Sequence, residues 1–215
     1  MIDKFLGFTR KKLDIIPVTE PLNHMTSHEM KRGFSYLIKE KDAKNSFEIF
    51  KSLVKGRCPD CSYPEAFPCE SIGCEECTLP CTCKGCKNIR AQGLCFSLRP
   101  NEDIRQNYLL QTTPIFWISN HGQDSVSPSG LEVMANMIVQ FLKKSRNPVV
   151  LLDGFEYLVL TNGFIPVFRL LRDVQEWIAI YRAIFLLPIN PIAIEKKEMA
   201  LVERCMEVIS LPEKE

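Results

Sequence analysis

Eight of the ten cysteines in this chain fall within 29 consecutive residues. Three pairs have the spacing C-x-x-C, and two single cysteines lie between those pairs. A C-x-x-C turn can place two thiolates on one metal ion, and two such turns complete a tetrahedral site. The eight candidate metal ligands are Cys58, Cys61, Cys69, Cys74, Cys77, Cys81, Cys83 and Cys86.

Eight thiolates are enough for two structural zinc sites of four cysteines each. We predict a nested arrangement with an outer and an inner site. The outer site would use Cys58, Cys61, Cys83 and Cys86, and the inner site Cys69, Cys74, Cys77 and Cys81. An iron–sulfur cluster is the alternative, although the spacing differs from the common ferredoxin pattern. Disulfides or free thiols are less favoured, because clustered cysteines in a reducing compartment are typically metal ligands.

The cysteine block is rich in Pro and Gly and poor in aliphatic residues. It cannot build a hydrophobic core, so metal binding would have to supply its folding free energy. We therefore predict a small metal-binding insertion at residues 56–91.

The overall charge is nearly balanced, with 27 basic and 26 acidic residues and a net charge of +1. This balance gives no reason to expect nucleic acid or an anionic membrane as a partner. The apolar run at 183–189 is far too short to span a bilayer, and the first residues have no signal-peptide pattern. We expect a cytoplasmic protein.

Outside the cysteine block, short apolar strands alternate with amphipathic helices. The expected strands are 34–40, 94–98, 114–119, 149–153 and 183–189. The expected helices are 42–55, 101–108, one that starts with Ser127 as N-cap and Pro128 at the first position, 165–181, and 195–209. We expect Cys95, in a strand, and Cys205, in the last helix, to be small core residues.

This alternation predicts an α/β fold, with a doubly wound, mainly parallel sheet of five strands. The predicted organisation is an N-terminal tail at 1–30 and an α/β domain at 31–212, with the insertion at 56–91 inside that domain.

Polar residues follow several of the predicted strands. Sheets of this kind bind ligands where their strands end, so a pocket could form there. Its candidate residues are Asp153, Glu156, Arg99, Asn190, Asn120 and His121. The alternative is a row of ordinary loop residues, since Asp153 in an Asp-Gly pair is also typical of a turn.

The sequence lacks the phosphate-binding loop of a P-loop NTPase. That loop, G-x-x-x-x-G-K-[ST], follows the first strand, where its glycines allow backbone N–H groups to surround the phosphates. Here the segment at 39–47 contains Lys44, Asn45 and Ser46 but no glycine. The dinucleotide motif G-x-G-x-x-G is absent too.

The second half of the chain resembles archaeal domain-of-unknown-function family 835. The resemblance is carried by the segments NPVVLLDGFEYLVLTNGF (147–164) and LLPINPIAIEKKEMALVERCME (186–207), with shorter pieces at 33–40, 97–100 and 115–119. It implies a RecA- or KaiC-type core that resembles a degenerate P-loop NTPase, and a signalling or regulatory role. It implies no catalytic residues.

Together these observations predict a non-catalytic regulatory or protein-interaction module with structural zinc, whose partner is another protein. The alternatives are an iron–sulfur redox sensor or electron carrier, and a nucleotide-binding protein without a P-loop.

Overall fold

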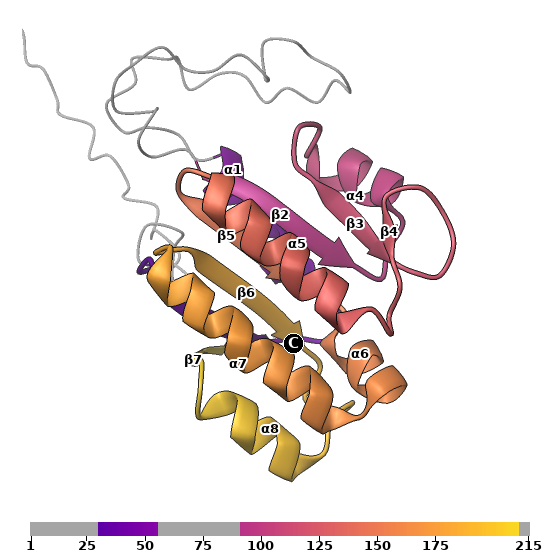
Figure 1. Cartoon of the computed structure of the whole chain (residues 1–215), viewed down its shortest axis with the longest axis vertical. Helices are drawn as coiled ribbons and strands as arrows, with labels where there is room; N and C mark the ends of the chain where they lie inside the picture. The colour runs from indigo at the N-terminus through magenta and orange to yellow at the C-terminus, as the bar shows by residue number, and fades with distance from the viewer. Residues whose placement is uncertain (1–29, 56–90, 211–215) are drawn as a thin grey trace, which may run out of the picture.

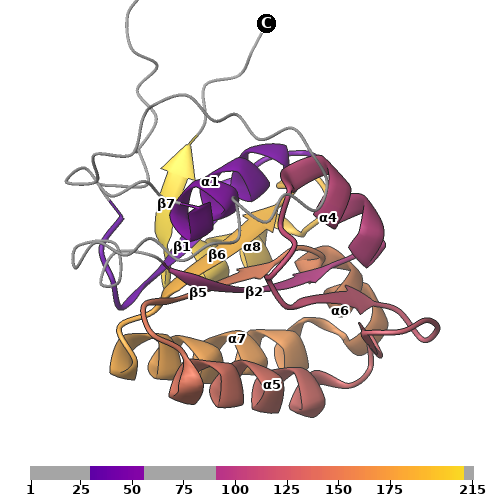
Figure 2. The same cartoon turned by 90° about the horizontal axis from the view of Figure 1, so that it is seen from above.

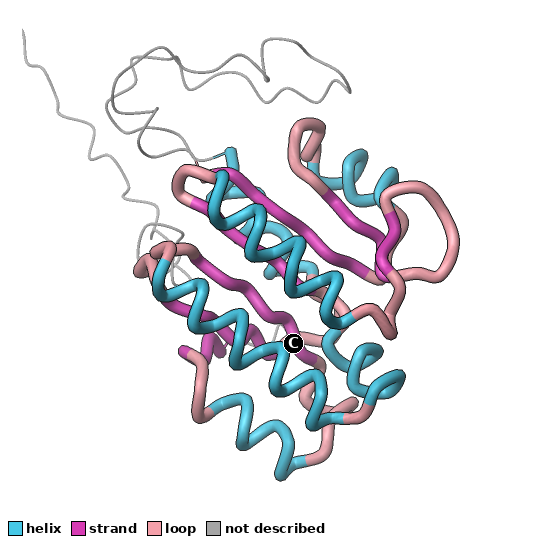
Figure 3. The backbone as a smooth tube through the Cα atoms, viewed as in Figure 1, coloured by secondary structure: helices cyan, strands magenta, loops and turns pink. Residues whose placement is uncertain are grey.

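The fold was analysed in a computed structural model, which describes residues 30–55 and 91–210. The elements of the first half are β1 (Phe34–Lys39), α1 (Lys44–Lys55), β2 (Gln92–Ser97), α4 (Asn101–Tyr108), β3 (Ile115–Ile118) and β4 (Ser125–Val126). Those of the second half are α5 (Leu131–Lys144), β5 (Pro148–Leu152), α6 (Phe155–Asn162), α7 (Phe164–Ile180), β6 (Ile184–Ile189), α8 (Lys196–Glu203) and β7 (Glu207–Ser210). Figure 3 shows how helices and strands alternate along the chain.

The strands form one sheet in the order β4-β3-β2-β5-β6-β1-β7, and every pairing is parallel. All strands therefore begin at one edge, the amino edge, and end at the opposite carboxyl edge. In Figure 1 the strand arrows share one direction. The predicted α/β fold with a mainly parallel sheet is confirmed.

Helices cover both faces of the sheet. Figure 2 shows α1 and α4 on one side, and α5 and α7 on the other. Within β5, Val150 and Leu152 pack into the core under α5 and α7, while Val149 and Leu151 pack under α1. Because successive side chains in a strand point to opposite faces, a strand covered on both sides must be apolar throughout. All five residues of β5 and all six of β6 are buried.

The prediction of five strands was wrong, because the described sheet has seven. The two additional strands, β4 and β7, are short, and they are the first and the last strand in the order of the sheet. The predicted helix at 195–209 ends at Glu203, and the residues EVIS at 207–210 pair with β1 instead. Such a short segment becomes a strand through its tertiary pairing, which local periodicity does not reveal.

Two helix predictions also need correction. Helix α5 begins at Leu131, because Ser127 forms a turn in which its carbonyl accepts a 2.9 Å hydrogen bond from Gly130 N. Helix α6 was not predicted, since its apolar residues do not form one regular stripe. The strong stripe of α7 is confirmed by its buried residues Val167, Leu170, Leu171, Val174 and Ile178.

Cys95 is fully buried in β2, as predicted. Cys205 lies just after α8 and not within a helix. It is partly buried, and its thiol donates to Val202 O over 3.2 Å. The predicted tail at 1–30 and the predicted insertion at 56–91 lie outside the described residues, apart from Met30 and Ala91 at their ends.

No helix within the described ranges is both long enough and apolar enough to cross a membrane.

Candidate functional site at the carboxyl edge

The central predicted site residues do lie at the carboxyl edge. Asp153 follows β5, Arg99 lies two residues beyond β2, and Asn190 follows β6. Glu156 is in the first turn of α6, which starts immediately beyond β5. Strands β2, β5 and β6 are consecutive in the sheet, so the residues that follow them lie next to one another along the carboxyl edge.

Asp153 is held by the end of β2. Its backbone N donates to Phe96 O over 2.8 Å, and its Oδ2 accepts a 2.6 Å hydrogen bond from Ser97 Oγ. Burial raises the pKa of the Asp153 carboxyl, and the nearby charges of Glu156 and Glu40 add to the increase. The Ser97 hydrogen bond and the charge of Arg99 oppose it. Asp153 is therefore a carboxyl group that the fold keeps partly desolvated.

Glu156 and Asn190 both make hydrogen bonds within the chain. Glu156 Oε1 accepts a 2.5 Å hydrogen bond from the backbone N of Asn190, which ties α6 to the end of β6. The Asn190 side chain accepts from Ile192 N over 3.1 Å, so it closes its own turn. These contacts are those expected if both residues are ordinary loop residues and not part of a binding pocket.

Asn120 and His121 are exposed in the loop between β3 and β4, and their bonds stay near that loop. Asn120 Oδ1 accepts from Ser127 Oγ over 2.7 Å, and His121 N donates to Ser119 Oγ over 3.1 Å. Strand β2 separates β3 from β5. The hydrogen bonds of Asn120 and His121 therefore stay near their own loop and do not reach Asp153.

Arg99 connects β2 to the segment after β1. Its guanidinium donates to the carbonyl of Asp42 and lies 5.4 Å from the centre of the Phe47 ring. Phe47, on α1, stacks on Tyr108 of α4 with 4.7 Å between ring centres. Arg99 thus fixes the loop at 40–43 against the first turn of α1.

Glu40 is the residue that sequence reasoning missed. It is buried, and its carboxylate lies over the start of α1. Asn45 N donates to Oε2 over 2.8 Å, Ser46 N donates to Oε1 over 2.9 Å, and Ser46 Oγ donates to Oε1 as well. A sequence signal was present, because a carboxylate shortly before the polar first turn of a helix is typical of N-terminal capping.

The remaining N–H groups of the first turn of α1 are also bonded within the chain. Lys44 N donates to Asp42 Oδ1 over 3.3 Å, and Phe47 N donates to Ala43 O over 3.0 Å. The exposed N–H groups at a helix start are the usual binding site for a phosphate. At α1 the carboxylates of Glu40 and Asp42 fill this position.

Several carboxylates lie near Asp153 at this part of the edge. The charges of Glu156 and Glu40 both act on Asp153, and Arg99 is the guanidinium that opposes them there. Across residues 30–55 and 91–210, no group of three or more His, Cys, Asp or Glu side chains is arranged to hold a metal ion.

The eight predicted cysteine ligands lie outside the described residues. The chain leaves the described part at Lys55, the end of α1, and returns at Ala91, just before β2. Both points belong to the amino edge. Strand β2 has six residues and spans roughly 20 Å at the usual rise per residue, which separates these attachment points from Ser97 and Asp153.

Solved structures with the same fold include a KaiC-like protein from the hyperthermophilic archaeon Pyrococcus horikoshii. It matches with a TM-score of 0.52 at 11% sequence identity, over 91% of this chain and 84% of that one. A second Pyrococcus horikoshii protein, solved in a structural study, matches with a TM-score of 0.51 at 12% identity, over 88% and 89% of the two chains. At such low identity these matches establish the fold alone.

No curated protein matches this sequence. A family described as "Protein of unknown function (DUF835)" matches residues 84–206, more than half of the chain. Among the described elements, this match covers those from β2 to α8. The chain belongs to the DUF835 family of proteins of unknown function, built on a KaiC-like fold.

Proposed function

We propose that this protein is a non-catalytic regulatory or protein-interaction module, whose KaiC-like sheet does not bind nucleotide and whose cysteine block holds structural zinc. One observation carries the first part of the proposal, namely the Glu40 carboxylate on the first turn of α1. The spacing of the eight cysteines supports the second part.

A nucleotide would meet two obstacles at this edge. Its phosphate would have to displace the buried Glu40 carboxylate, which already accepts two backbone hydrogen bonds and one from a side chain. It would also enter a region where Asp153 and Glu156 add negative charge. Like charges repel most strongly where water is excluded, so both effects oppose phosphate binding.

The loop between β1 and α1 strengthens this argument. Only residues 40–43 connect the two elements, and none of them is a glycine, whereas a P-loop depends on glycines to surround the phosphates. Arg99 further fastens this short loop through the Asp42 carbonyl. The Arg99 guanidinium is therefore engaged in holding this loop.

The test is a calorimetric titration of the full chain with ATP in the presence of magnesium, up to millimolar concentration. We expect no saturable heat. Saturable binding that Arg99→Ala abolishes would overturn the proposal, and would favour the alternative of a nucleotide-binding protein without a P-loop. A nearby substitution that leaves the edge intact, Glu48→Gln, serves as the control.

The zinc in this proposal serves the interaction role. A closed four-cysteine site keeps no open coordination position and acts as a structural clip. A second protein is the partner that we propose for the cysteine block.

A further inference from the structure

The net charge of the chain conceals an uneven distribution of charge over the fold. The amino edge carries a group of basic side chains in the segments that precede β1, β5 and β6. We call this group the basic edge, and its members are Lys31, Arg32, Lys143, Lys144, Arg146 and Arg182. Arg32 is partly buried and the other five are exposed.

Contacts between the segments keep these residues together. Arg32 Nη1 donates to Pro148 O over 3.4 Å, which connects the start of β1 to that of β5. Gly33 N donates to Ala183 O over 2.6 Å, which brings Arg32 beside Arg182. Strand β6 lies between β1 and β5, so all three segments are neighbours.

The segment before β5 is anchored on its other side too. Arg146 N donates to Gln92 Oε1 over 2.5 Å, and Lys143 Nζ lies 5.7 Å from the centre of the Trp177 ring. The basic edge therefore gathers basic side chains at the starts of β1, β6 and β5, and Arg146 bonds it to the start of β2.

Few described acidic residues offset this strip. Glu176, one turn before the end of α7, and Glu207, at the start of β7, are the carboxylates whose elements bring them nearest to it. Helix capping explains only part of the charge. Lys143 and Lys144 lie in the last turn of α5, where cations favour the helix dipole, but the other four lie in loops.

We propose that the basic edge binds the phosphate backbone of nucleic acid, a property that goes beyond the proposed function. A strip of lysine and arginine with little opposing charge is typical of a surface that contacts phosphates through charge alone. A protein partner would be expected to bury an apolar centre, and the exposed large apolar side chains at this edge within the described residues are only Phe34 and Ile180. The balanced net charge, which led us to expect no nucleic acid, averages the basic edge with the acidic residues elsewhere in the chain.

The experiment measures fluorescence anisotropy of a short labelled duplex DNA of mixed sequence, titrated with the full chain. The test variant combines Lys144→Glu, Arg146→Glu and Arg182→Glu. Its matched control combines Lys41→Glu, Lys196→Glu and Lys197→Glu, which lie at the carboxyl edge. Both variants change the net charge by the same amount, so a difference between them reports on position.

We expect the natural chain to bind, with affinity that falls steeply from about 50 mM to about 200 mM salt. The test variant should bind at least about tenfold more weakly, with the salt dependence reduced by roughly one ion per lost phosphate contact, while the control is unchanged. Absence of binding by the natural chain, or equal loss in both variants, would overturn the proposal. Binding to phosphatidylserine vesicles without binding to DNA would overturn it in favour of a membrane surface.

A second variant separates a loss of binding from a loss of folding. The substitutions Lys144→Gln, Arg146→Gln and Arg182→Gln remove the same charges without introducing repulsion. This second variant should show a smaller loss in the same direction, and unchanged affinity for DNA would count against the proposal. Circular dichroism of each variant establishes that the sheet is folded.

Discussion

Glu40 is the single residue that distinguishes this carboxyl edge most clearly from a phosphate site. Its carboxylate accepts from two backbone N–H groups and one hydroxyl at the start of α1. A buried carboxylate in this position satisfies the helix and excludes other anions by charge and by volume. The same interaction stabilises the fold, which makes it measurable without any ligand.

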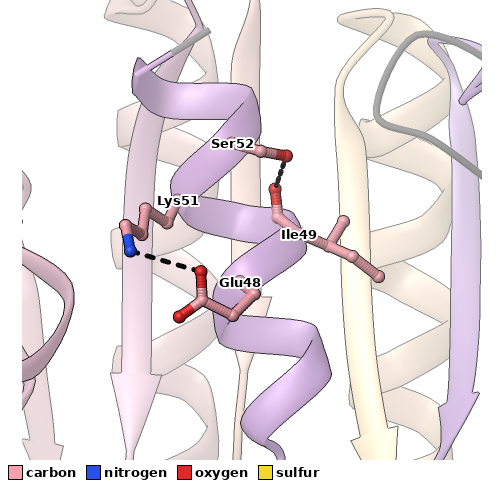
Figure 4. A network of polar contacts seen from close by, with 4 residues as sticks. All are labelled: Glu48, Ile49, Lys51 and Ser52. Atoms are coloured by element: carbon pink, nitrogen blue, oxygen red, sulfur yellow. Dashed lines mark hydrogen bonds and ion pairs between the residues drawn. The ribbon is translucent and has the colours of Figure 1, made fainter. Parts of the chain in front are cut away.

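We expect Glu40→Gln to lower the free energy of unfolding by about 1–3 kcal/mol, because an amide cannot accept at both positions and loses the charge-assisted bonds. The control is Glu48→Gln on the same helix. Glu48 lies near the surface and pairs with Lys51 over 3.2 Å, as Figure 4 shows. Such an exposed pair contributes about 0.5 kcal/mol or less. Urea unfolding followed by circular dichroism compares the two, and equal losses would contradict the role given to Glu40.

Asp153 makes a prediction about pH. Burial holds the pKa of Asp153 above 3.8, its ordinary value, so the folded protein binds this proton more tightly than the unfolded chain does. The resulting stabilisation is present at low pH and is lost as the pH rises through the folded-state pKa. The variant Asp153→Asn keeps an acceptor for Ser97 Oγ and cannot ionise. We expect it to be more stable than the natural chain at pH 7.

The difference in unfolding free energy between Asp153→Asn and the natural chain should shrink as the pH falls toward 3.8. Urea unfolding at several pH values measures it. A difference that grows at low pH would mean that the ionised carboxylate stabilises the fold, contrary to its burial.

At the scale of the elements, the junction between β5 and α6 determines how closely α6 approaches β2. Gly154 has a φ of +127°, and a Cβ atom there would lie 2.8 Å from Leu98 Cγ and 3.2 Å from Ile118 Cδ1. The close approach lets α6 start directly after β5, with Glu156 in reach of Asn190 N. A side chain at this position would have to displace the Leu98 side chain, just beyond β2, and press on Ile118.

We therefore expect Gly154→Ala to destabilise the protein by about 1–3 kcal/mol more than Gly163→Ala, because overpacking adds to the backbone strain. Gly163 is the matched control, since it also has a positive φ, +80°, but no atom lies within 4 Å of its added Cβ. The midpoint of urea unfolding compares the two variants. Equal destabilisation would show that only the backbone conformation matters at residue 154.

At the scale of the whole molecule, the two edges of the sheet serve different purposes. The carboxyl edge holds the carboxylates of Glu40, Asp153 and Glu156, whereas the amino edge holds the basic edge and both attachment points of the cysteine block. The core of the sheet consists of buried residues from the described elements on both sides of that block. We expect the sheet to stay folded when the metal is lost.

Metal analysis together with a visible absorption spectrum, on protein purified without oxygen, tests the composition of the block. We expect about two zinc ions per chain and no colour, from the count of eight cysteines. A brown protein that contains iron and acid-labile sulfide would contradict the zinc proposal and support an iron–sulfur cluster.

The variant Cys77→Ser tests the independence of the sheet. We expect it to lose zinc while most of the helical circular dichroism remains. A global loss of that signal would show that the block is integral to the core, and that the predicted division into domain and insertion is wrong.

The sequence by itself determined the α/β class, the parallel sheet and the absence of a P-loop. Apolar runs such as 149–152 and the stripe of α7 are local patterns, and so are the glycines that a P-loop would need. The sequence also placed Asp153, Arg99, Glu156 and Asn190 at the carboxyl edge, because the residues that end parallel strands share that edge.

Only the tertiary structure decided the rest. The edge strands β4 and β7 exist through pairing with β3 and β1, which adjacent residues do not encode. The contact between Arg99 and Asp42 joins positions 57 residues apart, and the basic edge gathers segments from residue 31 to residue 182. Charges and hydrogen bonds act over distances in space, so their partners become known only when the chain is folded.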